Sequence, residues 1–142
     1  MTQFSEDYVK QFTSERGNDP ARSALVIIDM QNATGHPDGP LARKMKAEGN
    51  SVTEWRFERI ATHVIPNTQK LITAMRKAGG RVIYVTIGAA LPDCSDAPIH
   101  MRGFFQSLGN YEGQYAHQII DELAPKPGDP IVRKTSMGAF AS

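Results

Sequence analysis

Three apolar runs along the chain predict β-strands. Residues 24–30 (ALVIIDM) and 81–87 (RVIYVTI) are continuous β-branched stretches, and residues 131–133 (IVR) form a shorter one. A continuous run, unlike an alternating one, is typical of a parallel strand that is covered on both faces. We therefore predict two buried strands, the first of them central in a parallel sheet, and a short third strand.

Helical spacing of apolar positions predicts helices between these strands and before them. Segments 66–78 and 115–123 each place apolar residues on one face, and Gly79-Gly80 ends the first of them. Segment 5–16 predicts an amphipathic arm that packs on the body of the protein or on a neighbouring subunit. The residues at 17–20 (GNDP) end this arm.

The order strand, helix, strand, helix, strand predicts an α/β fold with a parallel sheet and right-handed crossovers. We assign residues 1–20 to the arm and residues 21–142 to one domain. The Gly/Pro-marked stretches 31–51 and 88–113 are predicted to be loops. Because loops of this length are uncommon unless they serve a function, we expect them to cover a binding site.

Composition and charge narrow the class of protein. The 142 residues are 40% hydrophobic and 22% charged, with a net charge of +1, which indicates a globular domain without a field suited to nucleic acid. A single cysteine excludes an internal disulfide and fits a reducing compartment. The chain shows no secretory signal and no apolar run of the ~20 residues that a membrane span needs. We expect a cytoplasmic protein with neither nucleic acid nor a membrane as its partner.

Residues that can carry chemistry follow the predicted strands. Asp29 closes the first, Gly88 follows the second and Lys134 closes the third. In a parallel sheet these ends share one edge, and open α/β folds bind their ligands there. The sequence therefore predicts a crevice for a small-molecule substrate, lined by a carboxylate and an ammonium. The plainer alternatives stay open, with Asp29 as a turn cap and Lys134 as a solvated side chain.

Other chemical motifs are absent or uninformative. The chain has no P-loop, no dinucleotide-binding fingerprint and no G-x-S-x-G elbow of a serine hydrolase. Its four histidines lack metal-ligand spacing, so we predict no metal site and no cofactor. Cys94 lies beside Asp93 and Asp96, whose charges raise the pKa of a thiol, and we interpret it as incidental rather than nucleophilic.

Three stretches of the chain resemble isochorismatase-like cysteine hydrolases. They are residues 24–32 (ALVIIDMQN), residues 78–85 (AGGRVIYV) and residues 122–140, which contain ELAPKPGD, IVRK and GAF. The resemblance runs from about Ala24 to the last residue. It implies a three-layer, Rossmann-like α/β sandwich that is incomplete in this chain, and a hydrolase with an Asp–Lys–Cys triad.

The resemblance also implies roles for two residues. Asp29 matches the general base that takes the thiol proton, and Lys134 matches the cation that favours the thiolate. In the family the cysteine lies one unit beyond this lysine. We therefore expect the nucleophile outside this chain, in another chain of the assembly or lost by cleavage or premature termination. We expect the isolated chain to be inactive, and its partner to be a second copy or a complementary C-terminal fragment.

The resemblance further implies cleavage of a C–N bond in a small amide, carbamoyl or ureide substrate. A metal-free amidase is favoured, since segment 88–100 lacks the paired histidines of the zinc-dependent nicotinamidase branch. Gln31, Asn32 and Phe140 are candidate substrate-binding residues, with loop hydrogen bonds and core packing as the alternative. Two other functions stay open: an inert truncated subunit or small-molecule binding module, and an isochorismatase-type vinyl ether hydrolase. A haloacid-dehalogenase-type phosphatase is disfavoured, because Gln31 stands where that class needs a second aspartate.

Overall fold

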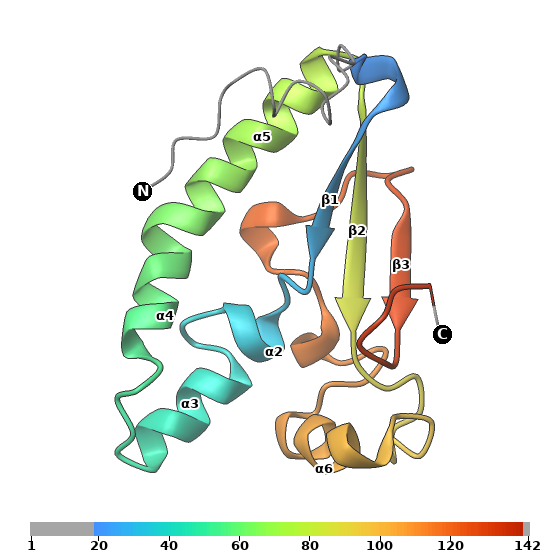
Figure 1. Cartoon of the computed structure of the whole chain (residues 1–142). Helices are drawn as coiled ribbons and strands as arrows, with labels where there is room; N and C mark the ends of the chain where they lie inside the picture. Colours follow the sequence, from blue (N-terminus) through green and yellow to red (C-terminus); the bar gives the residue numbers. More distant parts are fainter. Residues whose placement is uncertain (1–18, 141–142) are drawn as a thin grey trace, which may run out of the picture.

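Three parallel strands form the centre of the fold in the order β1-β2-β3 (Figure 1). The strands are β1 (Ala24–Ile28), β2 (Arg81–Ile87) and β3 (Ile131–Lys134), in a computed structural model that describes residues 19–140. All three predicted strands and their parallel order are confirmed. The prediction that the first strand is central is wrong for the described residues, because β2 lies in the middle and β1 at an edge.

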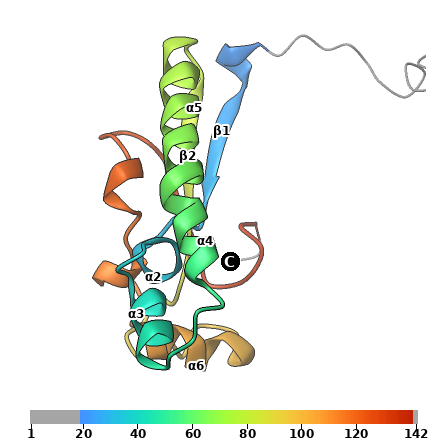
Figure 2. The ribbon, with the colours of Figure 1, turned by 90° about the vertical axis from the view of Figure 1, so that its left-hand side faces the viewer.

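One long helical segment covers one face of the sheet (Figure 2). It consists of α4 (Glu54–Arg59), a π-helical turn η2 (Ile60–Val64) and α5 (Ile65–Lys77). The predicted helix over 66–78 is confirmed, but helical structure begins twelve residues earlier than predicted. Buried side chains of the helix, of β1 and β2 and of residues 120–123 form the core on this face: Ile27, Ile65, Ile72, Val82, Tyr84, Ile120 and Leu123.

Two segments predicted as loops contain helices. The stretch after β1 folds into α2 (Asn32–Gly35) and α3 (Pro40–Ala47), and the stretch after β2 contains α6 (Ile99–Leu108). These helices gather below the sheet in Figure 1, at the end where the strands finish. The long segments therefore surround the predicted edge, but as ordered helices rather than as irregular loops.

The predicted helix over 115–123 is wrong. Two short 3-10 turns, η3 (Tyr115–His117) and η4 (Asp121–Leu123), take its place, and a third, η1 (Pro20–Arg22), precedes β1. The backbone between η3 and η4 is extended because it bonds to the chain after β1. Asn32 N donates to Gln118 O at 2.9 Å, and Ile120 N donates to Met30 O at 3.1 Å.

The predicted arm over residues 5–16 lies outside the described residues. Among residues 19–140, no helix has the length and the apolar character needed to cross a membrane.

Candidate active site

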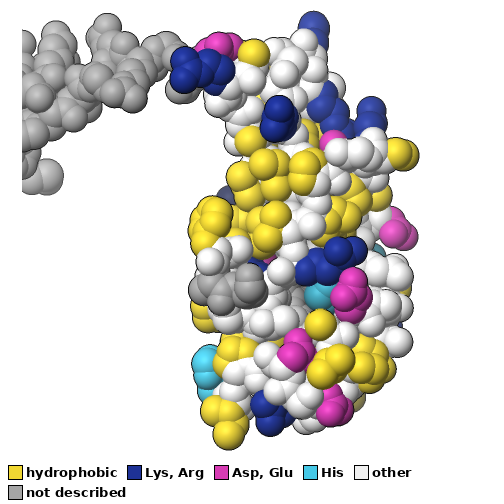
Figure 3. All heavy atoms as spheres, turned by 90° about the vertical axis from the view of Figure 1, so that its right-hand side faces the viewer, with side chains coloured by type: hydrophobic (Ala, Val, Ile, Leu, Met, Phe, Trp, Pro, Cys, Tyr) yellow, Lys and Arg dark blue, Asp and Glu magenta, His cyan; other side chains and the backbone are white. Residues whose placement is uncertain are grey.

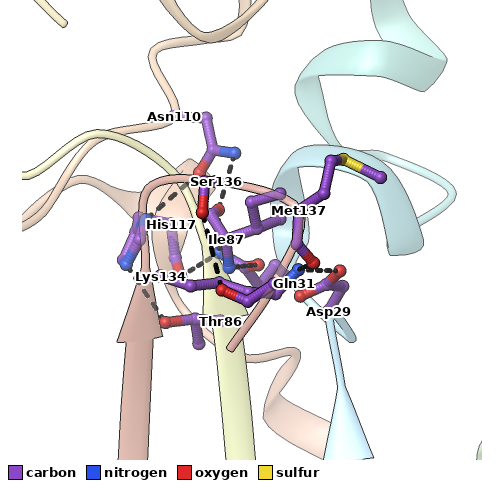
Figure 4. Close-up of polar contacts among 10 residues, drawn as sticks. Asp29, Gln31, Thr86, Ile87, Asn110, His117, Lys134, Ser136 and Met137 are labelled. Atoms are coloured by element: carbon purple, nitrogen blue, oxygen red, sulfur yellow. Dashed lines mark hydrogen bonds and ion pairs between the residues drawn. The ribbon is translucent and has the colours of Figure 1, made fainter. Parts of the chain in front are cut away.

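Asp29 and Lys134 meet at the edge of the sheet where the strands end (Figure 4). Lys134 Nζ donates to Asp29 Oδ2 at 3.0 Å, although Asp29 follows β1 and Lys134 ends β3, and β2 lies between these two strands. The Lys134 side chain is only 4% exposed, whereas the Asp29 side chain is 34% exposed. The structure thus brings together the carboxylate and the ammonium that the sequence placed at one edge.

The backbone at Asp29 turns the chain away from the sheet. Its N–H still donates to Val85 O at 2.9 Å, as in a strand, but its φ of 57° is left-handed. Aspartate tolerates this conformation better than most residues, and such backbones gather at functional sites. Asp29 Oδ1 is buried and has no hydrogen-bond partner among the described residues. The carboxylate therefore keeps one acceptor unused while the other binds Lys134.

The ammonium of Lys134 is held from two directions. It donates to Asp29 and also to Met137 O at 3.4 Å, in the turn that follows β3. The pairing of Lys134 with Ile87 in the β2–β3 register fixes its height at the end of the sheet. A lysine is rarely this buried unless it is paired, because an unpaired ammonium loses its hydration.

Gln31 and Asn32 are buried beside this pair, and most of their amide atoms bond to the backbone. Gln31 Nε2 donates to Ile87 O at 3.1 Å and to His117 O at 2.8 Å, while Gln31 Oε1 accepts from Ile87 N at 2.8 Å. Asn32 Nδ2 donates to Tyr115 O at 3.1 Å, and Asn32 Oδ1 has no partner among the described residues. Both residues thus make the loop hydrogen bonds given as the alternative above, and their contact with substrate stays a prediction.

Phe140 does not wall the site in this structure. Its side chain is fully exposed, so it packs against neither Lys134 nor the core. The expectation that Phe140 lines a pocket beside Lys134 is therefore not met by the described residues. The turn from Thr135 to Phe140 carries it into solvent instead.

Cys94 belongs to another part of the molecule. It is fully buried in a small cluster with Ala89, Ala97 and Phe105, under α6. Burial raises the pKa of the Cys94 thiol, and the charges of Asp96 and Asp93 raise it further. Since Cys94 is the chain's one cysteine, the Asp29–Lys134 pair has no thiol from these 142 residues.

A buried polar cluster around His117 was missed by the sequence analysis, which considered the histidines only as metal ligands. His117 Nε2 faces Thr86 Oγ1 and His117 Nδ1 faces Asn110 Oδ1, both at 3.3 Å. A Cβ at Gly88 would come within 2.4 Å of His117 Nδ1, so this position requires glycine. Burial lowers the pKa of His117; the charge of Glu112 opposes this shift and that of Arg133 adds to it. The glycine after the second strand was the one available signal of a close approach.

No group of three His, Cys, Asp or Glu side chains in the described part of the chain is placed to hold a metal ion.

The Isochorismatase domain profile matches residues 23–142. The chain belongs to the isochorismatase family. The fold is similar to that of a cysteine hydrolase from Pseudomonas syringae pv. phaseolicola 1448A, with a TM-score of 0.64 and 27% identity over 87% of this chain and 51% of that one. It is also similar to an isochorismatase family protein from Desulfovibrio vulgaris subsp. vulgaris str. Hildenborough, with a TM-score of 0.61 and 28% identity over 83% of this chain and 55% of that one.

A third solved structure shares the fold. It is an N-carbamoylsarcosine amidase from Thermoplasma acidophilum, with a TM-score of 0.51 and 24% identity over 83% of this chain and 54% of that one. The chain thus spans about half the length of each of these proteins. The family and the α/β fold expected from the sequence are confirmed.

Proposed function

We propose that this chain supplies the basic and cationic half of the active site of a cysteine hydrolase. The enzyme cleaves a C–N bond in a small amide, carbamoyl or ureide substrate, and its cysteine comes from a segment outside this chain. The observation that carries the proposal is the pair formed by Lys134 Nζ and Asp29 Oδ2 at 3.0 Å, with the lysine buried, at the ligand-binding edge of a parallel sheet. The likeness to a cysteine hydrolase supports it.

In this mechanism Asp29 takes the proton of the cysteine thiol, and the ammonium of Lys134 stabilises the thiolate. The sulfur attacks the carbonyl carbon of the substrate and forms a tetrahedral intermediate. Collapse of this intermediate breaks the C–N bond, and the departing nitrogen takes the proton from Asp29. A water molecule, deprotonated by Asp29, then attacks the thioester and releases the acid and the free thiol.

The sheet face opposite α5 is exposed, which favours docking of another segment beside the Asp29–Lys134 pair. Val26, Ile28 and Val132 are 46%, 58% and 38% exposed, although apolar strand residues are normally covered. Among the described residues, no strand pairs with the outer edge of β1. An open edge and an apolar face together favour addition of another strand. We propose that the cysteine-bearing segment, which lies outside these 142 residues, docks here, next to the Oδ1 of Asp29 that has no partner among the described residues.

The experiment uses the tagged 142-residue chain, expressed in its own source organism and purified with its assembly intact. Amine and ammonia release is measured from propionamide, biuret and N-carbamoylsarcosine; the last is included because a protein of this fold carries the name N-carbamoylsarcosine amidase. We expect hydrolysis by the assembly and a loss of about 10²–10⁴-fold in kcat/KM in Asp29→Asn and Lys134→Met. The exposed residues Asp121 and Lys126 provide the matched controls Asp121→Asn and Lys126→Met, which retain activity.

Two further measurements separate the parts of the proposal. Iodoacetamide is expected to inactivate the assembly by labelling a cysteine outside this chain, and the isolated chain is expected to show no turnover. Hydrolysis that survives in both Asp29→Asn and Lys134→Met contradicts the role of the pair. Hydrolysis of a vinyl ether in place of every C–N probe contradicts the substrate class but leaves the pair in its role.

A further inference from the structure

A hollow lies on the opposite face of the sheet from Lys134. The strand register pairs Thr86 with Arg133 and Ile87 with Lys134, and successive side chains of a strand point to opposite faces. Thr86 and Arg133 therefore face the side that carries α5. Beside β3, where α5 does not reach, these residues line a hollow of about 400 Å³ together with Glu112, His117, Ile119 and Ile131. Its volume is in the range of small-molecule sites.

Both signs of charge are presented at the rim of this hollow. Arg133 Nε and Glu112 Oε1 form an ion pair at 3.0 Å, with side chains 57% and 49% exposed. Neither side chain makes another hydrogen bond among the described residues, so the outer guanidinium N–H groups and one carboxylate oxygen remain available. On the side of the molecule shown in Figure 3, basic and acidic side chains lie next to a histidine, below a region of hydrophobic side chains.

The remaining walls are apolar or neutral. Ile119, Pro125 and Ile131 provide hydrocarbon surface on one side. At the back lies the imidazole of His117, which is only 8% exposed and hydrogen-bonds to Thr86 and Asn110. A ligand that fits this hollow therefore meets a positive and a negative charge at the rim, and no uncompensated charge inside.

We propose that this hollow binds a small aliphatic α-amino acid as a zwitterion. Its carboxylate lies on the free guanidinium edge of Arg133, its ammonium lies on Glu112, and its side chain packs against Ile119 and Ile131. A zwitterion satisfies both rim charges, whereas a simple carboxylate or amine satisfies one of them and competes with the existing ion pair. This proposal does not depend on the hydrolase function, since none of these residues belongs to the Asp29–Lys134 site.

The test is a titration of the full chain with L-leucine, followed through the ring signals of the histidines by NMR. His117 should shift with saturation, while the exposed His63 and His100 serve as internal references. 4-Methylpentanoate lacks the ammonium of leucine and isopentylamine lacks its carboxylate, and each should bind at least about tenfold more weakly. Arg133→Gln and Glu112→Gln should each weaken leucine binding by a similar factor. Arg22→Gln, an exposed arginine at the other end of the sheet, is the matched control.

Three results overturn the proposal. They are no saturable shift of His117 with leucine, equal binding of 4-methylpentanoate or isopentylamine, and unchanged binding in both rim variants. Protein-concentration-dependent shifts of His117 without ligand would instead identify this face as a contact between copies of the chain. Asp29→Asn should bind leucine as the wild-type chain does, so failure at this site and failure of the hydrolase proposal are distinguishable.

Discussion

On the face of the sheet that carries α5, the side chains of Leu25, Ile27 and Val82 are covered by the helix and by the turns that follow α6. On the opposite face, Val26 and Ile28 of the same strand are largely exposed. The two sets alternate along one apolar run, so the sequence gives them the same character. A continuous apolar strand is typically buried on both of its faces. In this chain, the described residues bury only the face that carries α5.

The buried titratable side chains on these two faces have different hydrogen-bond partners. On the face opposite α5, Lys134 forms an ion pair with Asp29. On the α5 face His117 lies between the hydroxyl of Thr86 and the amide of Asn110, and burial lowers its pKa. A charged pair beside an exposed apolar face is suited to reaction with a partner, whereas a buried imidazole between two uncharged hydrogen-bonding side chains adds no charge to its surroundings.

The difference in burial between the two faces of β1 predicts the largest effect on the free energy of unfolding. Ile27 is 5% exposed and its neighbour Ile28 is 58% exposed, so the two residues form a matched pair on opposite faces. Ile27→Ala should lower the free energy of unfolding by about 2–5 kcal/mol, because it leaves a cavity in the core. Ile28→Ala should change it by less than about 0.5 kcal/mol. Urea titrations of both variants measure the difference.

Equal losses in the two variants would contradict the comparison. They would mean that the outer face is covered in the purified chain, by self-association or by a copurified segment. Sedimentation of the same samples distinguishes a single chain from such an assembly.

The strands were predictable because their signal is local. The β-branched runs at 24–28 and 81–87 specify strands whatever surrounds them, and the parallel order follows from the helix between them. The early start of the long helix was not predictable from Pro66, which usually marks a beginning. Here a π-helical turn precedes the proline, with Ile65 N donating to Ile60 O, and shifts the hydrogen-bond register where a proline N–H is missing.

The errors concern segments whose backbone is set by distant partners. Apolar spacing over 115–123 predicted a helix, although Ile120 and Leu123 are buried without one and Ile120 N bonds to Met30 O across the molecule. Start and stop residues of the helix α6 are present in the sequence, but the glycines of the segment 88–113 favoured a loop. The helix begins after Pro98 and ends at Gly109, which adopts the left-handed conformation of a helix stop.

The hydrogen bonds of Gln31 at the end of the sheet predict an intermediate effect on the free energy of unfolding. Gln31 joins the chain after β1 to Ile87 and His117 by three hydrogen bonds, and Gln31→Leu removes all three. His117 O and Ile87 N then lose this side-chain partner, while Ile87 O keeps its bond from Asn110 Nδ2. We expect a loss of about 1–3 kcal/mol in the free energy of unfolding. Gln69→Leu is the matched control, because Gln69 Nε2 also donates to a backbone carbonyl, that of Glu122, but at the surface. If Gln31→Leu lowers the free energy of unfolding no more than Gln69→Leu does, the hydrogen bonds of Gln31 do not stabilise the fold.

The candidate site itself was predictable in its two charged residues and not in their surroundings. Topology alone places the ends of β1 and β3 at one edge, and the resemblance to the family selected Asp29 and Lys134 among the residues there. The amides of Gln31 and Asn32 were noted as neighbours in the chain, but their partners come from 56 to 86 residues away. No local pattern carries such contacts, so a side chain that braces the turn after β1 could not be told from one that faces a substrate.

The buried imidazole of His117 predicts the smallest effect, which is a dependence of the free energy of unfolding on pH. Because burial lowers the pKa of His117 in the folded chain, the unfolded chain binds more protons just below the ordinary histidine pKa of about 6.5. The free energy of unfolding should therefore fall as the pH is lowered from about 6.5 towards the folded pKa, by at most about 1.4 kcal/mol per pH unit. Urea midpoints of the wild-type chain and of His117→Gln between pH 7.5 and pH 4.5, about the window in which histidine titrates, isolate this contribution as the difference in slope. His100→Gln controls for the loss of an exposed histidine, and parallel slopes for the wild-type and His117→Gln chains would mean that His117 accepts its proton without unfolding the face that covers it.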